Sequence, residues 1–171
     1  MNSLEISNTQ RTDAPFIYFL FEEAISYQKR NHYPVWKGYD KIAIESDIEN
    51  RLQFKIMINT EIACVFSICY SDALIWRERD NGNSVYLHRV VVNPKFKGRK
   101  LFGEIVKWVK NHAKEKRLKH IRMDTWVDNP TIIKYYKGFG FKVIDYYTTP
   151  DNIELPIPQR NNFVVLLQYE L

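Results

Sequence analysis

The 171-residue chain has little of what marks disordered, membrane-spanning or secreted proteins. Six Gly and seven Pro are too few, and 15% aromatic residues too many, for a disordered or collagen-like chain. A membrane-spanning helix needs about 20 consecutive apolar residues, and the apolar runs at 17–21 and 163–167 are far shorter. The first ten residues have no basic and no apolar stretch, so we predict no secretion signal and expect a cytoplasmic protein.

The chain has only two cysteines, Cys64 and Cys69, five positions apart in an apolar run. On a strand these side chains face opposite sides, so the two cannot form a local disulfide. Neither belongs to a CxxC pair, which argues against structural zinc and for a reducing compartment. We interpret both as small core residues and predict no metal cofactor.

Positive charge is concentrated in one segment. Residues 95–122 contain eleven Lys and Arg against two acids, or +9, whereas the rest contains fourteen against eighteen, or −4. Such a segment favours an anionic ligand. The alternative is a solvated, lysine-rich helix face.

The composition, with 45% hydrophobic and 26% charged residues and no linker or repeat, predicts a single domain over residues 1–171. The hydrophobic period predicts strands near 4–7, 53–58, 61–70, 84–93, 121–127, 141–147 and 163–169, and helices near 14–30, 42–52, 97–117 and 130–138. The strand-helix-strand unit at 84–127 makes a right-handed parallel crossover, while antiparallel strands flank it. We therefore predict an α+β fold with three α/β/α layers and a mixed, mostly antiparallel sheet.

The most informative segment is the strand end, basic loop and helix start at 90–103. A helix that begins here leaves backbone N–H groups without partners and directs the positive end of its dipole at the loop. Lys97, Arg99 and Lys100 add charge at the same place. This arrangement predicts a phosphate or diphosphate site, with a capped helix and a solvated basic end as an equal alternative.

The same segment resembles the central signature of the GNAT superfamily of N-acetyltransferases. Val90-x-Val92-x-Pro94 matches its strand, and Lys97-Gly98-Arg99-Lys100-Leu101-Phe102 occupies its loop. Downstream, Asp128-Asn129, Tyr136 and Gly140-Phe141 match the rest, so the resemblance covers about 85–147. The chain departs from the signature at Lys97, usually Arg or Gln, at Lys100, usually Gly, and at Phe102, usually a small residue.

The resemblance implies a central pair of parallel strands that splay apart and hold acetyl-CoA, the co-substrate. It assigns the pantetheine arm to the backbone of Val90, Val91 and Val92 and to Asn129. It assigns the diphosphate to the loop amides from Lys97 to Phe102, and it makes Tyr136 the group that hydrogen-bonds or protonates the departing thiolate. The alternative for Tyr136 is an aromatic residue on the core-facing stripe of its helix.

An acceptor ammonium must lose a proton before it can attack, so a base is needed. Residues 86, 88, 90 and 92 share one face of a regular strand, and His88 titrates in the right range, so it is our candidate base. The alternative is a hydrogen-bonded strand histidine. The acceptor pocket is predicted at Trp36 and Tyr39, beside Tyr33, through cation–π contacts, unless these rings pack onto the nearest helices. Trp126 is also predicted to face the cleft.

We therefore predict an N-acetyltransferase that transfers an acetyl group directly to a primary amine of a small molecule or a peptide. A second hypothesis is a nucleic-acid-binding module that uses residues 95–122, although the chain lacks a recognisable reader motif or stacking stripe. A third is a catalytically degenerate, CoA-binding member of the family. The resemblance also allows a homodimer through the last strands, and no membrane partner is expected.

Overall fold

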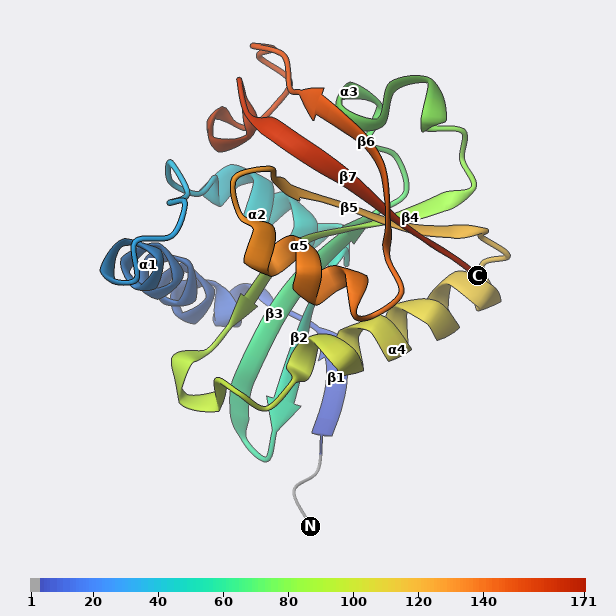
Figure 1. Ribbon diagram of the computed structural model, residues 1–171. Helices are drawn as coiled ribbons and strands as arrows, with labels where there is room; N and C mark the ends of the chain where they lie inside the picture. The colour runs from blue at the N-terminus through green and yellow to red at the C-terminus, as the bar shows by residue number, and fades with distance from the viewer. Residues whose placement is uncertain (1–3) are drawn as a thin grey trace. The chain divides into compact units, whose positions relative to one another are not determined.

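The computed structural model describes residues 4–171, which contain seven strands and five α-helices (Figure 1). The strands are β1 (Leu4–Asn8), β2 (Gln53–Ile58), β3 (Glu61–Cys69), β4 (Ser84–Val92), β5 (His120–Trp126), β6 (Lys142–Thr148) and β7 (Phe163–Glu170). The helices are α1 (Ala14–Arg30), α2 (Lys41–Glu49), α3 (Ala73–Trp76), α4 (Leu101–Glu115) and α5 (Pro130–Lys137). The strand order in the sheet is β1-β2-β3-β4-β5-β7-β6, and β4 and β5 are parallel. The predicted mixed α+β fold is confirmed.

The chain divides into two compact units. Unit 1 comprises residues 4–68 and 89–101, and unit 2 comprises residues 69–88 and 102–171. The boundary falls inside β4, between His88 and Arg89. A single domain over residues 1–171 stays a prediction.

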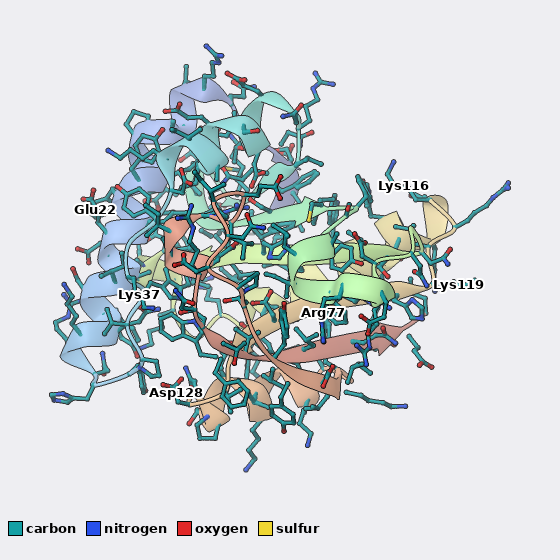
Figure 2. All side chains as sticks on the ribbon, turned by 90° about the horizontal axis from the view of Figure 1, so that it is seen from above. Glu22, Lys37, Arg77, Lys116, Lys119 and Asp128 are labelled. Atoms are coloured by element: carbon teal, nitrogen blue, oxygen red, sulfur yellow. The ribbon has the colours of Figure 1, made fainter. Side chains whose placement is uncertain are left out.

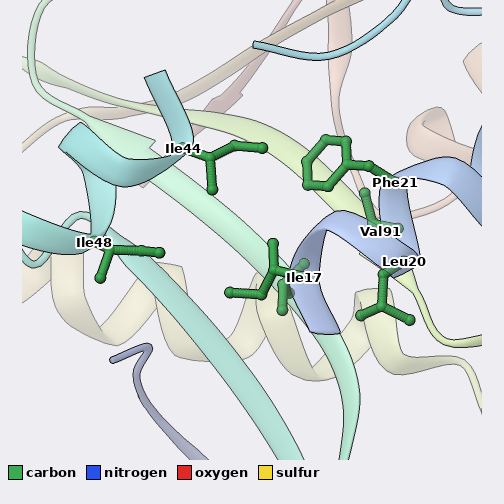
Figure 3. Packing of buried hydrophobic residues seen from close by; sticks show 7 residues of the cluster. Ile17, Leu20, Phe21, Ile44, Ile48 and Val91 are labelled. Carbon is green, nitrogen blue, oxygen red and sulfur yellow. The ribbon is translucent and has the colours of Figure 1, made fainter. Parts of the chain in front are cut away.

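Unit 1 is a three-stranded antiparallel ladder with the helices α1 and α2. β1 pairs with β2 and β2 with β3, and Asn59, with φ of 55°, makes the turn between β2 and β3. Ile17, Leu20 and Phe21 recur at helical spacing, so one face of α1 is apolar and packs against α2 (Figure 3). Seven buried residues form this core: Ile17, Leu20, Phe21, Ile44, Ile48, Val65 and Val91. Val91 is 2% exposed and fixes the end of β4 in this unit.

Unit 2 is built on β7, which pairs antiparallel with β5 on one side and β6 on the other. Its main buried cluster comprises Ile75, Trp76, Tyr86, Leu155, Val164 and Leu166. The predicted start of α5 is confirmed, because Pro130 lies in its first turn and Asn129 Oδ1 accepts a hydrogen bond from the Ile132 N–H at 3.2 Å. This cap holds Asn129 between β5 and α5.

Two predicted helix boundaries are wrong because of residues with positive φ. Gly98 (φ 84°) and Lys100 (φ 55°) leave the helical region, so α4 begins at Leu101 and not at Lys97. Arg51 (φ 58°) follows α2, which ends at Glu49 and not at Leu52. Helix α3 was not predicted, because four residues carry no helical period. Within residues 4–171 no helix has the length and apolar character required to cross a bilayer.

Candidate active site

The parallel pair β4–β5 is hydrogen-bonded only at its beginning. Ser84 lies opposite His120 and Tyr86 opposite Arg122, and among the described residues of unit 2 the ladder has no further pair. Three residues after Tyr86, Arg89 has a φ of 52°, outside the extended region, and its guanidinium bonds Asp47 Oδ2 at 2.7 Å. The alternation that predicted a common face for residues 86, 88, 90 and 92 therefore does not extend past His88.

His88 lies between two carboxylates where this pairing ends. Its Nε2 is 3.3 Å from Asp72 Oδ2, and its Nδ1 is 3.9 Å from Asp124 Oδ1. Asp72 precedes α3 and Asp124 lies on β5. The three side chains are 11%, 12% and 20% exposed for His88, Asp72 and Asp124 respectively. The nitrogen and oxygens lie within 4.8 Å of one another, near enough to share a proton or a small cation.

Their surroundings shift the pKa values of two members of this group. Burial alone would lower the pKa of His88, but the neighbouring Cys69 and Asp72 outweigh burial and raise it well above its ordinary value. Burial raises the pKa of Asp124 to about 6, against the opposing effect of His88. His88 therefore holds a proton more tightly than an ordinary imidazole, and it can act as a general base only at a pH above this raised pKa. The absence of a metal cofactor stays a prediction.

Neither Asp72 nor Asp124 was predicted as a site residue. Asp124 had a detectable signal, since it is an acid within a predicted strand and the burial of its carboxylate has to be compensated. Asp72 had none, because it lies in a loop outside any motif. Only the tertiary structure brings it to His88.

The basic loop of unit 1 keeps its turn despite the departures from the signature. Asn93 Oδ1 accepts a hydrogen bond from Lys95 N at 3.0 Å, and Lys97 N donates to Pro94 O at 3.2 Å. Gly98 follows with φ of 84°, and a Cβ there would meet no atom within 4 Å. Lys100 adopts the left-handed conformation that glycine usually takes at this position, so lysine preserves the loop.

Two lysine side chains of this loop, those of Lys95 and Lys97, already have partners. Lys95 Nζ bonds Glu61 at 2.6 and 2.7 Å. Lys97 Nζ bonds Tyr27 Oη and lies 3.9 Å from the centre of its ring. The best-placed anion donors are therefore the backbone N–H groups that open α4, together with the exposed Arg99 and Lys100.

The remaining basic residues of 95–122 do not belong to this loop. Figure 2 shows Lys116 and Lys119 beyond the carboxyl end of α4, where both are exposed. A helix of 15 residues is about 22 Å long, so these lysines cannot reach an anion at its amino end. The basic residues of 95–122, although close together in the sequence, therefore do not form a single site in the structure.

The bulky Phe102 is accommodated by α5. Its side chain is 5% exposed, and its ring centre lies 4.9 Å from that of Tyr136, 5.7 Å from Tyr135 and 5.0 Å from Phe139. Phe102 therefore packs into an aromatic cluster that joins α4 to α5. The half-buried Tyr136 takes part in this cluster, as the alternative of a packed aromatic residue predicts, and its role in the site stays a prediction.

The predicted acceptor residues lie mostly within aromatic packing. The ring centres of Trp36 and Tyr39 lie 5.8 and 5.3 Å from that of Phe21 in unit 1, and Tyr39 Oη donates to Glu22 Oε1 at 2.7 Å. Trp126 packs against the buried cluster of unit 2. The alternative of simple packing therefore describes much of these rings, and their contact with substrate stays a prediction.

Comparison with known proteins places this geometry in a family context. Residues 21–141 match the acetyltransferase (GNAT) family. An N-acetyltransferase of Bacillus subtilis (strain 168), YesJ, is 28% identical over 112 residues, which are 62% of this chain and 61% of that protein. The chain thus spans under two thirds of that relative's length.

Solved structures share the fold. A GNAT-family acetyltransferase from Listeria monocytogenes superposes with a TM-score of 0.82 at 21% identity, covering 98% of this chain and 95% of that one. YncA of Salmonella typhimurium, solved with its cofactor acetyl-CoA, superposes with a TM-score of 0.67 at 17% identity, covering 99% and 95%. At these identities the likeness establishes the fold alone.

Proposed function

The chain belongs to the acetyltransferase (GNAT) family, and from that premise we propose that it is an N-acetyltransferase that transfers an acetyl group from acetyl-CoA directly to a primary amine. The observation that carries the proposal is the buried group of His88, Asp72 and Asp124 at the point where the β4–β5 pairing ends. We further propose that the 171 residues act as one domain. Cytoplasmic location and a homodimer stay predictions.

The residues that would hold acetyl-CoA fit its chemistry. Of the loop amides from Lys97 to Phe102, those of Lys97 and Arg99 already donate to Pro94 O and Phe96 O, so the other N–H groups and the dipole of α4 would bind the diphosphate. The Asn129 Oδ1 caps α5, which leaves its side-chain NH₂ as a donor for the pantetheine arm. The Val91 side chain is buried in the core of unit 1, so Val90, Val91 and Val92 would contribute through their backbone.

The proposed role of His88 is to take the proton of the acceptor ammonium. Because Asp72 and Asp124 stabilise the imidazolium that results, the proton can stay on the ring while the amine reacts. Bound acetyl-CoA supplies a thioester carbonyl carbon, to which the amine nitrogen bonds as the C–S bond breaks. A β4 amide near Val90 or Val91 would stabilise the negative charge on the carbonyl oxygen, and Tyr136 would donate its proton to the departing thiolate. The second proton, which the nitrogen loses as it becomes an amide, would restore the Tyr136 hydroxyl.

The proposed acceptor is a primary amine of a small molecule or of a peptide. Two carboxylates beside one imidazole favour a group that arrives with positive charge. The residues outside 95–122 carry a net charge of −4, which also suits a cationic acceptor. Trp36, Tyr39 and Trp126 remain our candidates for contacts with the rest of the acceptor.

Release of CoA thiol, measured over a panel of polyamines, amino sugars and peptides with an unblocked amino terminus, tests the proposal. We expect acceptor-dependent release. We expect Tyr136→Phe to lower kcat without raising the KM for acetyl-CoA, and His88→Ala to abolish the ascending limb of the pH–rate profile. Release that no acceptor stimulates, or a His88→Ala profile equal to that of the wild type, would contradict the proposed chemistry.

A further inference from the structure

Asp80, in the loop before β4, accepts hydrogen bonds from the segment that carries Asp72 and from Tyr86, which lies on β4 with His88. Its Oδ2 accepts hydrogen bonds from Ser71 Oγ at 2.7 Å and from the backbone N–H of Asp72 at 3.0 Å. Its Oδ1 accepts a hydrogen bond from Tyr86 Oη at 2.6 Å. Tyr86 precedes His88 by two residues on β4, so their side chains leave the strand on the same face.

A buried network holds Tyr86 in place. Tyr86 is fully buried, and its Oη accepts a hydrogen bond from Arg122 NH1 at 3.1 Å. Arg122 is 4% exposed, and its Nε donates to Gln168 Oε1 at 2.8 Å. Burial would raise the pKa of Asp80, but the hydrogen bonds from Tyr86, Ser71 and Asp72 lower it overall, so Asp80 is ionised. The network therefore runs from β7 through β5 and β4 to the loop that carries Asp72.

The carboxylate of Asp72 faces His88 through its Oδ2. Among residues 4–171 its Oδ2 is buried and has no hydrogen-bond partner of good geometry, although it lies 3.3 Å from His88 Nε2. Its place beside His88 therefore depends on the backbone, which Asp80 fixes through the Asp72 N–H.

We propose that Asp80 is a positioning residue that holds the Asp72 carboxylate against the imidazole of His88. The inference rests on the proposed function, in which His88 takes the acceptor's proton. The charged and titratable groups that face His88 are Cys69 at the end of β3, Asp72 before α3 and Asp124 on β5. Of these, Asp72 is the one that Asp80 binds.

The substitution Asp80→Asn tests this role with little change in shape. The amide is neutral, so its oxygen accepts weaker hydrogen bonds from Ser71 Oγ and the Asp72 N–H than the carboxylate does, and an NH₂ turned toward these donors loses both bonds. As Asp72 moves from His88, the imidazolium loses an opposite charge at 3.3 Å. An opposite charge at this range shifts a pKa by roughly 1–3 units, so the His88 titration midpoint falls by about one pH unit.

The direct readout is an NMR titration of the four histidine rings, with His88 assigned through the missing signal of His88→Gln. The matched control is Asp145→Asn, which removes another aspartate of unit 2 that pairs with Arg77 and Arg79. We expect the His88 midpoint to fall in Asp80→Asn and to stay unchanged in Asp145→Asn. In enzyme assays we expect kcat to fall about tenfold in Asp80→Asn, with the KM for acetyl-CoA unchanged and the ascending pH limb displaced to lower pH.

A folded Asp80→Asn protein with the wild-type His88 midpoint would overturn the proposal. If that variant does not fold, Tyr86→Phe removes a single donor to Asp80, and a wild-type midpoint there would overturn it equally. Because the titration needs no turnover, its outcome is separate from the proposed function: a displaced midpoint supports the positioning role even in a protein that transfers no acetyl group.

Discussion

The substitution Gly98→Ala changes the backbone conformation of the basic loop without changing its charge, so it separates the effects of the two on stability and on acetyl-CoA binding. The φ of Gly98 is 84°, and a Cβ there would meet no atom within 4 Å, so Gly98→Ala introduces no clash. An L-residue in the left-handed region costs roughly 1–2 kcal/mol, and alanine returns roughly 0.4–1 kcal/mol by restricting the unfolded chain. If the loop keeps its shape, the free energy of unfolding therefore falls by about 1 kcal/mol.

If the loop relaxes instead, its N–H groups turn away from the diphosphate, and the affinity for acetyl-CoA falls. Since 1.4 kcal/mol is tenfold in affinity, the KM for acetyl-CoA rises about fivefold. Gly82→Ala is the matched control, because Gly82 also has a positive φ (75°) and open space around it but lies in the turn before β4. We expect this control to lose similar stability with an unchanged KM.

Urea denaturation and a thiol-release assay measure the two quantities on the same samples. The reasoning also predicts that Lys100→Gly, which removes strain at φ 55°, leaves the KM for acetyl-CoA unchanged. The account of the loop would be refuted if Gly98→Ala kept both the wild-type free energy of unfolding and the wild-type KM for acetyl-CoA, because the positive φ of Gly98 would then cost nothing in either quantity.

Three further predictions concern unit 2 and the thiols. Phe102→Ala should lower the free energy of unfolding by about 3–5 kcal/mol in urea, because its ring is buried; a loss below about 1 kcal/mol would contradict this packing. Burial raises the pKa of Cys64 to about 12, so a chromogenic disulfide should label only Cys69 in the native protein, and rapid labelling of both would contradict it. Because the Asp80 pKa is lowered by folding, its stabilising effect is present above its unfolded pKa of about 4 and lost at lower pH; Asp80→Asn should flatten the acid limb of stability against pH, and an unchanged limb would contradict this.

The fold was predictable because its elements are encoded locally. Ile17, Leu20 and Phe21 recur at helical spacing, Asn129-Pro130 marks the start of α5, and a strand-helix-strand unit allows one handedness. The errors are equally local. Gly98 and Lys100 have positive φ, so α4 begins only after them. Hydrophobic periodicity does not reveal a lysine that adopts a left-handed conformation.

The candidate site was predictable only where it follows a linear motif. The loop from Lys97 to Phe102, Asn129 and Tyr136 could be proposed from the resemblance to the family signature, whereas the partners of His88 could not. Asp72 and Asp124 come from segments that are 52 residues apart in the chain. The buried bonds of Asp80 determine where Asp72 lies, and no local pattern encodes them.

The most direct test of the account is calorimetric titration of the purified protein with acetyl-CoA. The account predicts saturable binding of one molecule per chain, with Gly82→Ala binding as the wild type does. Absence of binding at millimolar acetyl-CoA by a folded protein would contradict it.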